Sequence, residues 1–328
     1  MKEFDTHRIF NIAHAKDFDA LALDVFRFQY KNNKVYKQFC ELLKKTPQKV
    51  LHHLEIPFLP ISFFKTHRVT STQKEAYTLF TSSGTTQSIT SKHFVPDIAL
   101  YEESFQRAFK QFYGKPEDFC VLALLPSYLE RKGSSLVYMV NSLIQKSEHP
   151  DSGFYLHNLE ELHQKLQELE QKKTKTLLIG VSFALLDLCE QFPIALKNTF
   201  VMETGGMKGR RKELIREELH HILKQGLGVD SIHSEYGMTE LLSQGYSKGD
   251  GIFNTPPWMK IITRDTEDPL TIQPNGKTGG INVIDLANIY SCSFIATQDL
   301  GKTHPNGSFE VLGRFDDSDV RGCNLMVL

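Results

Sequence analysis

An alternation of apolar runs and amphipathic segments through the middle of the chain constrains its fold more than any other feature. The apolar runs are short and almost uninterrupted, as in strands that are buried on both faces of a sheet. The segments between them repeat apolar side chains at helical spacing. The strand-like runs are residues 119–128, 176–183 and 199–204, and the helix-like segments are residues 99–113, 159–169, 184–191 and 210–224, the last ended by Gly226. This alternation predicts an α/β fold with mainly parallel sheets covered by helices.

The N-terminal region differs from this pattern. Residues 17–53 repeat apolar side chains at roughly helical spacing and predict an α-helical entry segment. Pro57 and Pro60 then exclude a continuous helix, so the apolar side chains of residues 58–64 predict buried extended structure.

The C-terminal region changes again after about Gly249, to short strands and Gly/Pro turns. Residues 274–280 and 304–308 carry hairpin-like signals. We therefore expect a smaller β-rich part within one domain of residues 1–315, followed by a short tail of residues 316–328.

Charge and length exclude several classes of protein. The chain has 328 residues and a formal net charge of −1, and its acidic and basic residues are interspersed. It is long enough to bury a sizeable core, and it carries neither a nucleic-acid footprint nor a basic membrane-surface patch. Its N-terminus lacks the apolar region of a signal peptide, and its longest apolar run is too short to span a bilayer. We expect a soluble cytoplasmic protein with no nucleic-acid partner and no membrane span.

Cysteines and histidines give no metal motif. The five cysteines are widely scattered and odd in number, which argues against a disulfide framework and against a CxxC site: Cys40, Cys120, Cys189, Cys292 and Cys323. All but Cys323 lie in apolar surroundings. The pairs His52/His53 and His220/His221 are adjacent, so we expect each pair to point to different sides of a helix rather than to bind one metal.

A hydroxyl-rich stretch at residues 77–86 is the first candidate site. A short strand-like segment leads into five hydroxyl side chains around Gly84, which lets the backbone turn sharply and approach a ligand closely. Successive backbone N–H groups in such a loop form an anion-binding concavity, and the hydroxyls add further donors. The sequence therefore predicts a phosphate-binding loop, with a solvated Ser/Thr turn as the alternative.

Other nucleotide and hydrolase motifs are absent or imperfect. The two G-K-T triplets at 276–278 and 301–303 lack the earlier glycine of a P-loop, and no GxGxxG or HExxH occurs. G-V-S-F-A at 180–184 sits between a strand and a helix like a nucleophile elbow, but it ends in alanine. A serine hydrolase built on Ser182, with Asp230 and His233, stays open as an alternative.

Two later stretches add candidate groups. H-S-E-Y-G-M-T-E at 233–240 brings two carboxylates near one glycine turn, and T-Q-D-L-G at 297–301 is followed by a strand-like run that ends at Arg314. Asp299 and Arg314 each end such a run, where binding groups of open sheets usually lie.

Together and in this order, T-S-S-G-T-T, Y-G-M-T-E, T-Q-D-L-G and G-R resemble the adenylate-forming superfamily of acyl and aryl ligases. I-P-F-L-P-I-S-F-F-K, E-T-G-G-M-K-G-R-R-K-E-L and P-P-W-M-K further resemble the LuxE acyl-protein synthetase family within it. The resemblance covers nearly the whole chain. It implies ATP-dependent and Mg²⁺-dependent activation of a carboxylic acid, in this family a fatty acid, to acyl-AMP.

The same resemblance implies a part for each matching residue. The phosphate loop would comprise Thr81, Ser82, Ser83, Gly84, Thr85 and Thr86. Gly205 and Gly206 would lie against the adenine, with Tyr236 stacked beside it and Gly237, Met238 and Thr239 completing the turn. Glu240 would approach Mg²⁺, Asp299 would bind the ribose hydroxyls, and Arg314 would lie near the ribose and phosphates. Carboxylates and a guanidinium suit these partners.

The chain departs from the superfamily pattern just after the hydroxyl-rich stretch and again after Arg314. Gln87 replaces a glycine and Lys92 arrives late, beside His93, which we expect to contact phosphate or substrate. After Arg314 only 14 residues follow in this sequence, so we expect the mobile C-terminal domain that typical members carry, with its catalytic lysine, to be missing.

Cys323 lies where the resemblance to LuxE implies a cysteine that accepts the acyl group as a thioester. A thiol is a competent acceptor because an ordinary cysteine is partly ionised near neutral pH. For Cys323, the alternative is a tail cysteine with no role. For the whole chain, the alternatives are a coenzyme A ligase of the phenylacetate type and a non-catalytic nucleotide-binding or acyl-binding module. The final acyl acceptor stays open between an acyl-accepting reductase, a carrier protein and coenzyme A.

Overall fold

The computed structural model describes residues 4–82, 89–126, 133–156, 158–205, 211–212 and 214–315. The helices are α1 (Ala15–Asn32), α2 (Lys34–Leu42), α3 (Phe63–Thr66), α4 (Ile98–Tyr113), α5 (Ser135–Ser147), α6 (Leu159–Gln171), α7 (Ser182–Gln191) and α8 (Arg216–Leu227), with 3-10 turns η1 (Thr6–Asn11), η2 (His53–Glu55), η3 (Pro116–Asp118) and η4 (Leu286–Asn288). The strands are β1 (Leu59–Pro60), β2 (Thr78–Thr81), β3 (Lys92–Val95), β4 (Cys120–Leu124), β5 (Gly153–Tyr155), β6 (Thr176–Val181), β7 (Thr199–Thr204), β8 (His233–Tyr236), β9 (Gly245–Ser247), β10 (Ile252–Asn254), β11 (Met259–Arg264), β12 (Thr278–Asp285), β13 (Phe294–Thr303) and β14 (Phe309–Arg314).

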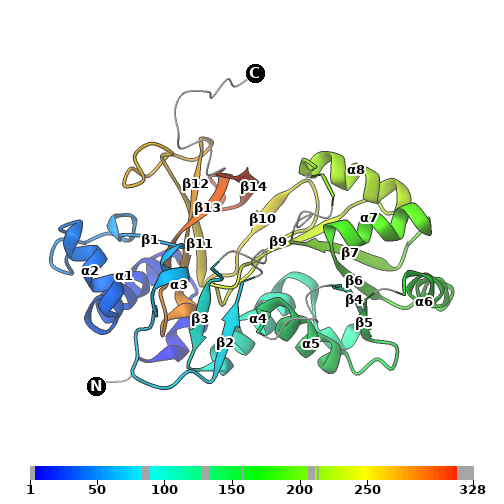
Figure 1. Ribbon diagram of the computed structural model, residues 1–328, viewed down its shortest axis with the longest axis horizontal. Coiled ribbons are helices and arrows are strands. Elements are labelled where there is room, and N and C mark those ends of the chain that lie inside the picture. Colours follow the sequence, from blue (N-terminus) through cyan, green and yellow to red (C-terminus); the bar gives the residue numbers. More distant parts are fainter. Residues whose placement is uncertain are drawn as a thin grey trace.

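Twelve strands of the described chain form one mixed sheet in the order β11-β12-β13-β14-β10-β9-β8-β7-β6-β4-β5, with β1 paired to β13 outside this path. The strands β5, β4, β6, β7 and β8 are parallel, as the alternation of runs predicted. Every residue of β4 and β6 is buried, because helices cover both faces: Figure 1 shows α7 and α8 along one face and α4 and α5 along the other. The predicted α/β fold is confirmed.

The other half of the sheet is antiparallel and receives the N-terminal helices. β11, β12, β13 and β14 pair in sequence order, and β12 and β13 are eight and ten residues long, longer than the short strands predicted. The predicted hairpin at 304–308 joins β13 to β14. The α-helical entry segment forms α1 and α2, which lie beside this half (Figure 1). Phe26 and Tyr36 pack on the Phe294 ring of β13.

Several predicted boundaries are wrong for identifiable reasons. Residues 63–66 form the short helix α3, not extended chain, because Phe64 N bonds back to Ile61 O at 3.1 Å in a turn. α8 begins at Arg216 rather than 210, and it ends before Gly228, whose φ of 61° is left-handed. Gly226 lies inside the helix, where an added Cβ would stand 2.5 Å from Cys189 Cβ of α7, so it serves close helix packing rather than capping.

The helix α5 was not predicted, although its pattern is present in the sequence. Leu136, Met139, Val140 and Leu143 recur at helical spacing, and the Ser134 hydroxyl accepts from Val137 N at 3.3 Å as an N-cap. No helix among the described residues is long and apolar enough to cross a membrane.

Candidate active site

The hydroxyl-rich stretch begins at the tip of a two-stranded hairpin. β2 and β3 pair antiparallel, with Thr81 opposite Lys92 and Phe80 opposite His93. At the base of the loop, Ser82 N donates to Ser91 O at 3.2 Å and Ser91 N donates to Ser82 Oγ at 2.9 Å. Of the residues predicted to bind phosphate, Thr81 and Ser82 lie at this base, whereas Ser83, Gly84, Thr85 and Thr86 lie outside the described residues.

His93 joins this hairpin to the turn that follows β8. Its side chain is 1 % exposed, its Nδ1 lies 2.8 Å from Thr239 O, and its Nε2 lies 3.0 Å from Asn288 Oδ1. Burial lowers the pKa of His93 to about 4, against the opposing effect of the two acceptors. The neutral ring faces protein partners on both sides, so these are the contacts of a positioning residue rather than of a group that faces a ligand.

The turn of residues 237–240 is fixed by buried side chains of the antiparallel half. Asn288 Nδ2 donates to Glu240 O at 2.8 Å. Asp285 accepts from Leu242 N at 2.7 Å and from Ser243 N and Oγ at 3.1 and 2.6 Å, and burial raises its pKa to about 6. These bonds hold Y-G-M-T-E against the hairpin of the hydroxyl loop.

Glu240 consequently lies at the base of the hydroxyl loop. Its side chain is buried, 5 % exposed, and it accepts a hydrogen bond from the Ser91 side chain. Burial raises the pKa of Glu240, and the Ser91 bond opposes that effect. The carboxylate predicted to approach Mg²⁺ and the base of the loop predicted to bind phosphate are thus neighbours in the fold, although they lie far apart in the sequence.

Three further predicted residues are brought together by β8, β13 and β14. The Tyr236 hydroxyl donates to Asp299 Oδ2 at 2.8 Å, and Arg314 Nε donates to Asp299 Oδ1 at 3.1 Å. Asp299 and Arg314 are paired directly across the two strands. The Asp299 side chain is 8 % exposed and that of Arg314 is 79 % exposed, so a shielded carboxylate stands beside an accessible guanidinium.

Arg264 supports this group and was missed by the sequence reasoning. Its buried guanidinium donates to Ile281 O at 2.8 Å and to Thr297 O at 2.6 Å. Desolvation lowers its pKa to about 10, and the charge of Asp299 opposes that effect. An added Cβ on Gly280 would lie 2.6 Å from Arg264 Cζ, so the G-G pair that we interpreted as a hairpin signal makes room for this arginine.

Glu235, the residue before Tyr236, is one of the two carboxylates that the sequence places near the glycine turn, but the sequence gave it no role. Thr204 Oγ1 donates to Glu235 Oε2 at 2.6 Å, across the edge where β7 and β8 end. Burial is the main cause that raises the pKa of Glu235 to about 7, and the nearby Glu203 raises it further. Gly237 leaves room for this side chain, because an added Cβ would lie 2.3 Å from Glu235 Oε1.

The structure does not favour the hydrolase alternative. Ser182 is buried and donates to Glu203 Oε2 at 3.3 Å and to Gly205 O at 3.2 Å, not to a histidine. His233 instead contacts the Tyr113 hydroxyl at 3.2 Å. Ser182 therefore fixes Gly205, whose φ is 69°, at the end of β7; Gly206, predicted beside it, lies outside the described residues.

The four cysteines of the described chain are buried, as expected. Burial raises the pKa of Cys40 to about 12 and that of Cys120 to about 11, and it raises those of Cys189 and Cys292 as well. These thiols are unsuited to accept an acyl group because the thiolate is the nucleophile. Cys323 lies outside the described residues.

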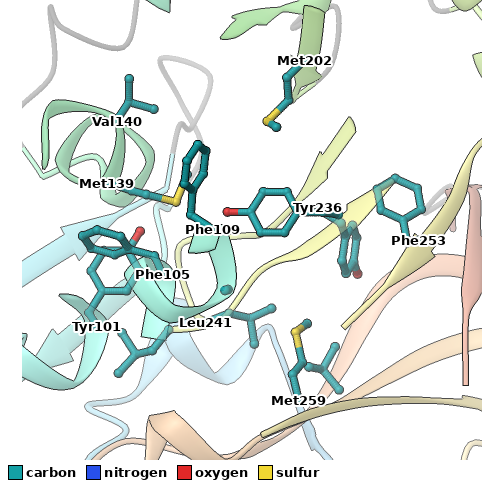
Figure 2. Close-up of a cluster of buried hydrophobic side chains, with 14 of the residues drawn as sticks. Tyr101, Phe105, Phe109, Met139, Val140, Met202, Tyr236, Leu241, Phe253 and Met259 are labelled. Atoms are coloured by element: carbon teal, nitrogen blue, oxygen red, sulfur yellow. The ribbon is translucent and has the colours of Figure 1, made fainter. Parts of the chain in front are cut away.

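An apolar cluster lies between the two halves of the sheet (Figure 2). Its labelled side chains come from α4, α5, β7, β8, β10 and β11 and the turn after β8: Tyr101, Phe105, Phe109, Met139, Val140, Met202, Tyr236, Leu241, Phe253 and Met259. All are buried. Tyr236 belongs both to this cluster and, through its hydroxyl, to the polar group around Asp299.

Comparison with known proteins matches most of the chain. The family described as acyl-protein synthetase, LuxE, matches residues 13–328. A long-chain-fatty-acid–luciferin-component ligase of Vibrio harveyi is 23 % identical over 93 % of this chain and 85 % of its own length. The ligase of the same name from Photorhabdus luminescens is 39 % identical over 66 residues, 20 % of this chain and 56 % of its own length.

Solved structures share the fold. ATP-bound MatB from Rhodopseudomonas palustris superposes with a TM-score of 0.52 at 16 % identity over 72 % of this chain; the match spans 47 % of the MatB chain, about half of its length. An open conformation of 2-hydroxyisobutyryl-CoA ligase, in complex with its acyl-AMP and CoA, gives a TM-score of 0.65 at 13 % identity over 92 % of this chain and 70 % of that one.

Proposed function

Because the chain belongs to the LuxE family of acyl-protein synthetases, we propose that it uses ATP to convert a long-chain fatty acid to acyl-AMP and passes the acyl group to a protein thiol as a thioester. The observation that carries this proposal is the assembly of Tyr236, Asp299 and Arg314 near one another, with Glu240 held at the base of the hydroxyl loop. A shielded carboxylate, an exposed guanidinium and a second buried carboxylate are groups that suit a magnesium nucleotide.

In this proposal each residue binds one part of the nucleotide. The hydroxyl loop that begins at Thr81 and Ser82 holds the β- and γ-phosphates, and Arg314, exposed and able to reach outward, lies near the ribose and phosphates. Asp299 accepts from the ribose hydroxyls, and the region after Gly205 and the turn from Tyr236 to Thr239 receive the adenine. His93 holds the hairpin against the turn that follows β8.

The donors around Glu240 fit a magnesium ion. Mg²⁺ in nucleotide sites is usually bound through one or two carboxylates together with substrate phosphates and water, and Glu240 offers one buried carboxylate beside Ser91 at the base of the loop. The ion supplies charge neutralisation at the phosphates when bound. The protein contributes position and a fixed electrostatic environment for attack of the acid carboxylate on the α-phosphate, which releases pyrophosphate.

A long-chain acid is supported by the named relatives and by the chemistry of the cluster in Figure 2. Two relatives carry fatty-acid ligase names. The apolar side chains behind the turn after β8 are buried, so an alkyl chain with its carboxylate toward Tyr236 reaches them only if side chains move. The methionines Met139, Met202 and Met259 are the adaptable members of this cluster.

The acceptor thiol is proposed to be Cys323. The described thiols are buried and have raised pKa values, so none of them is suited to the transfer. A coenzyme A ligase is the second candidate, favoured by the fold it shares with 2-hydroxyisobutyryl-CoA ligase.

Exchange of labelled pyrophosphate into ATP tests the activation step. Fatty acids from about 6 to 18 carbons, with aromatic and hydroxy acids as comparisons, should give exchange that rises with chain length, since each buried CH₂ contributes about 0.8 kcal/mol. Glu240→Gln should reduce exchange strongly, whereas Glu310→Gln, on β14 and paired with Lys302 and His304, should not. Absence of exchange with every acid in folded protein would contradict the proposal.

A further inference from the structure

A group of metal-binding side chains lies outside the candidate active site, where α1 meets the segment before β1. One ligand atom from each of Asp19, His52 and His53 lies within 4.8 Å of the other two. Asp19 is on α1, His53 begins η2, and His52 directly precedes it. The sequence predicted that this adjacent histidine pair would diverge, and that prediction is wrong: the two ring centroids are 4.4 Å apart.

The local backbone explains why the rings converge. His52 is the extended N-cap of η2, with φ −130° and ψ 146°, and its Nδ1 accepts from Leu54 N at 3.3 Å. Glu55 closes the cap by accepting from His52 N at 3.1 Å. The prediction assumed that both histidines lie within one helix. Here His52 is extended and His53 begins a 3-10 turn, so the two side chains are not separated by the rotation between helical neighbours. His220 and His221, inside α8, do diverge as predicted, since His220 is buried and His221 exposed.

His53 carries a buried nitrogen without a hydrogen-bond partner. The residue is 7 % exposed, and its Nδ1 lies 2.9 Å from Asp19 Oδ1 but makes no hydrogen bond. A buried nitrogen that faces a carboxylate oxygen outside hydrogen-bond geometry is poorly compensated. Ligand atoms about 2.0 to 2.1 Å from one metal ion stand roughly 3 Å apart, so this spacing suits two ligands of the same ion.

We propose that Asp19, His52 and His53 form a binding site for a divalent transition-metal ion of the zinc class, with water completing the coordination. Two imidazoles and one carboxylate are a donor set that Zn²⁺ accepts readily, and that hard ions such as Mg²⁺ and Ca²⁺ do not favour. Neutral imidazole is the form of histidine that binds a metal ion. The bound ion ties α1 to η2.

Lys260 of β11 is the group that competes with the metal. Its Nζ lies 3.3 Å from Asp19 Oδ1 and 4.3 Å from the centre of the Phe18 ring. The side chain is 34 % exposed, so it can turn outward into solvent when an ion binds. In the metal-free protein Lys260 is therefore the counter-ion of Asp19, and its removal should strengthen metal binding.

The test uses the full chain, freed of metal with a chelator, and a Zn²⁺ titration in competition with a chromophoric chelator. One tight site is expected in the wild type, and Asp19→Asn and His52→Gln should each weaken it at least tenfold. Lys260→Gln should strengthen it about tenfold, because an ammonium about 4 to 5 Å from a divalent ion repels it. His221→Gln is the matched control, an exposed histidine beside a buried one, and should leave binding unchanged.

Thermal unfolding and Co²⁺ absorption give readouts that do not depend on enzymatic activity. Zn²⁺ should raise Tm in wild type but not in Asp19→Asn, and Co²⁺ should give visible bands that His52→Gln lacks. Both variants alter partly or largely exposed side chains, so they should fold, with circular dichroism as the check. The proposal is overturned if the folded variants bind Zn²⁺ as tightly as wild type, or if wild type has no tight site.

Discussion

The Tyr236 hydroxyl and the Asp299 carboxylate are 2.8 Å apart although their strands are not neighbours. β14, β10 and β9 lie between β8 and β13 in the sheet order. In a flat sheet four strand spacings would separate them by about 19 Å, farther than two side chains reach. The sheet is therefore strongly curled at this point, and the curl delivers groups from its parallel and antiparallel halves to one place.

Asp299→Asn should weaken ATP binding at this junction. The amide keeps the shape of the carboxylate but loses the charge that faces Arg314, and it offers one acceptor oxygen instead of two. We expect KM for ATP to rise about tenfold or more, with a smaller change in KM for the acid. Pyrophosphate exchange at varied ATP and at varied acid separates the two. An equal effect on both KM values would point to general damage rather than to nucleotide binding.

Glu235 should make stability depend on pH. Burial raises its pKa in the folded protein to about 7 from the ordinary value of 4.5, so the folded state binds more protons than the unfolded state between these two values. Stability from this group is therefore fully present below about pH 4.5 and is lost as pH rises through 7. Urea unfolding at pH 5.5 and 8 should show a fall in wild type that is smaller in Glu235→Gln.

Asp285, whose pKa is also raised, to about 6, contributes to the same fall, so the informative quantity is the difference between wild type and variant. An identical fall in Glu235→Gln would show that Glu235 is ionised in the folded protein at neutral pH.

Removing one member of the Glu203–Arg216 ion pair should lower the free energy of unfolding strongly. Arg216 Nη1 donates to the buried Glu203 Oε1 at 2.6 Å, and His220 Nε2 lies 3.6 Å from the same oxygen. Arg216→Met leaves a buried carboxylate with weaker compensation and should lower the free energy of unfolding by about 3 to 5 kcal/mol. The double variant with Glu203→Gln should recover part of this loss. Denaturant unfolding of the four proteins in the cycle measures the coupling, and additive losses would contradict it.

The central strands β4, β6 and β7 and several helices were predictable because their signals are local. Uninterrupted apolar runs marked β4, β6 and β7, and helical spacing marked α4 and α6. Positions that depend on contacts between distant segments were not. Gly226 resembled a helix end because nothing in its own segment reveals Cys189 against it. The fit of Arg264 beneath Gly280 requires the register of β11 with β12, which the sequence does not state.

The candidate site divides in the same way. Motif order selected Tyr236, Glu240, Asp299 and Arg314, and the fold brings Tyr236, Asp299 and Arg314 into contact. The raised pKa of Glu235 depends on burial by other elements, so its neighbours in sequence gave no sign of it. The convergence of His52 and His53 depends on the backbone angles of one cap, which spacing rules for helices cannot supply.

Ser182→Ala should leave the activation step nearly intact. The hydroxyl is buried against Glu203 and Gly205 and has no histidine partner, so its loss removes two long hydrogen bonds and no nucleophile. We expect pyrophosphate exchange within about twofold of wild type and a stability loss of about 1 kcal/mol. A fluorophosphonate should not label the wild type. Labelling that Ser182→Ala abolishes would restore the hydrolase alternative.

Cys323→Ser should separate activation from transfer. If Cys323 is the acyl acceptor, the variant still forms acyl-AMP, so pyrophosphate exchange is unchanged. The wild type incubated with radiolabelled fatty acid and ATP should acquire a protein label that hydroxylamine removes, as expected of a thioester, and the variant should not. A serine hydroxyl is a far weaker nucleophile than a thiolate at neutral pH.

Cys120→Ser is the matched control for this experiment, because that thiol is buried and burial raises its pKa to about 11. It should label like the wild type, since it removes a thiol that an acyl-AMP cannot use. Label on Cys323→Ser equal to that on wild type would assign transfer to another group. Rapid formation of a coenzyme A thioester, with the protein unlabelled, would instead favour the coenzyme A ligase, because the activated acyl group would then leave on a diffusing thiol.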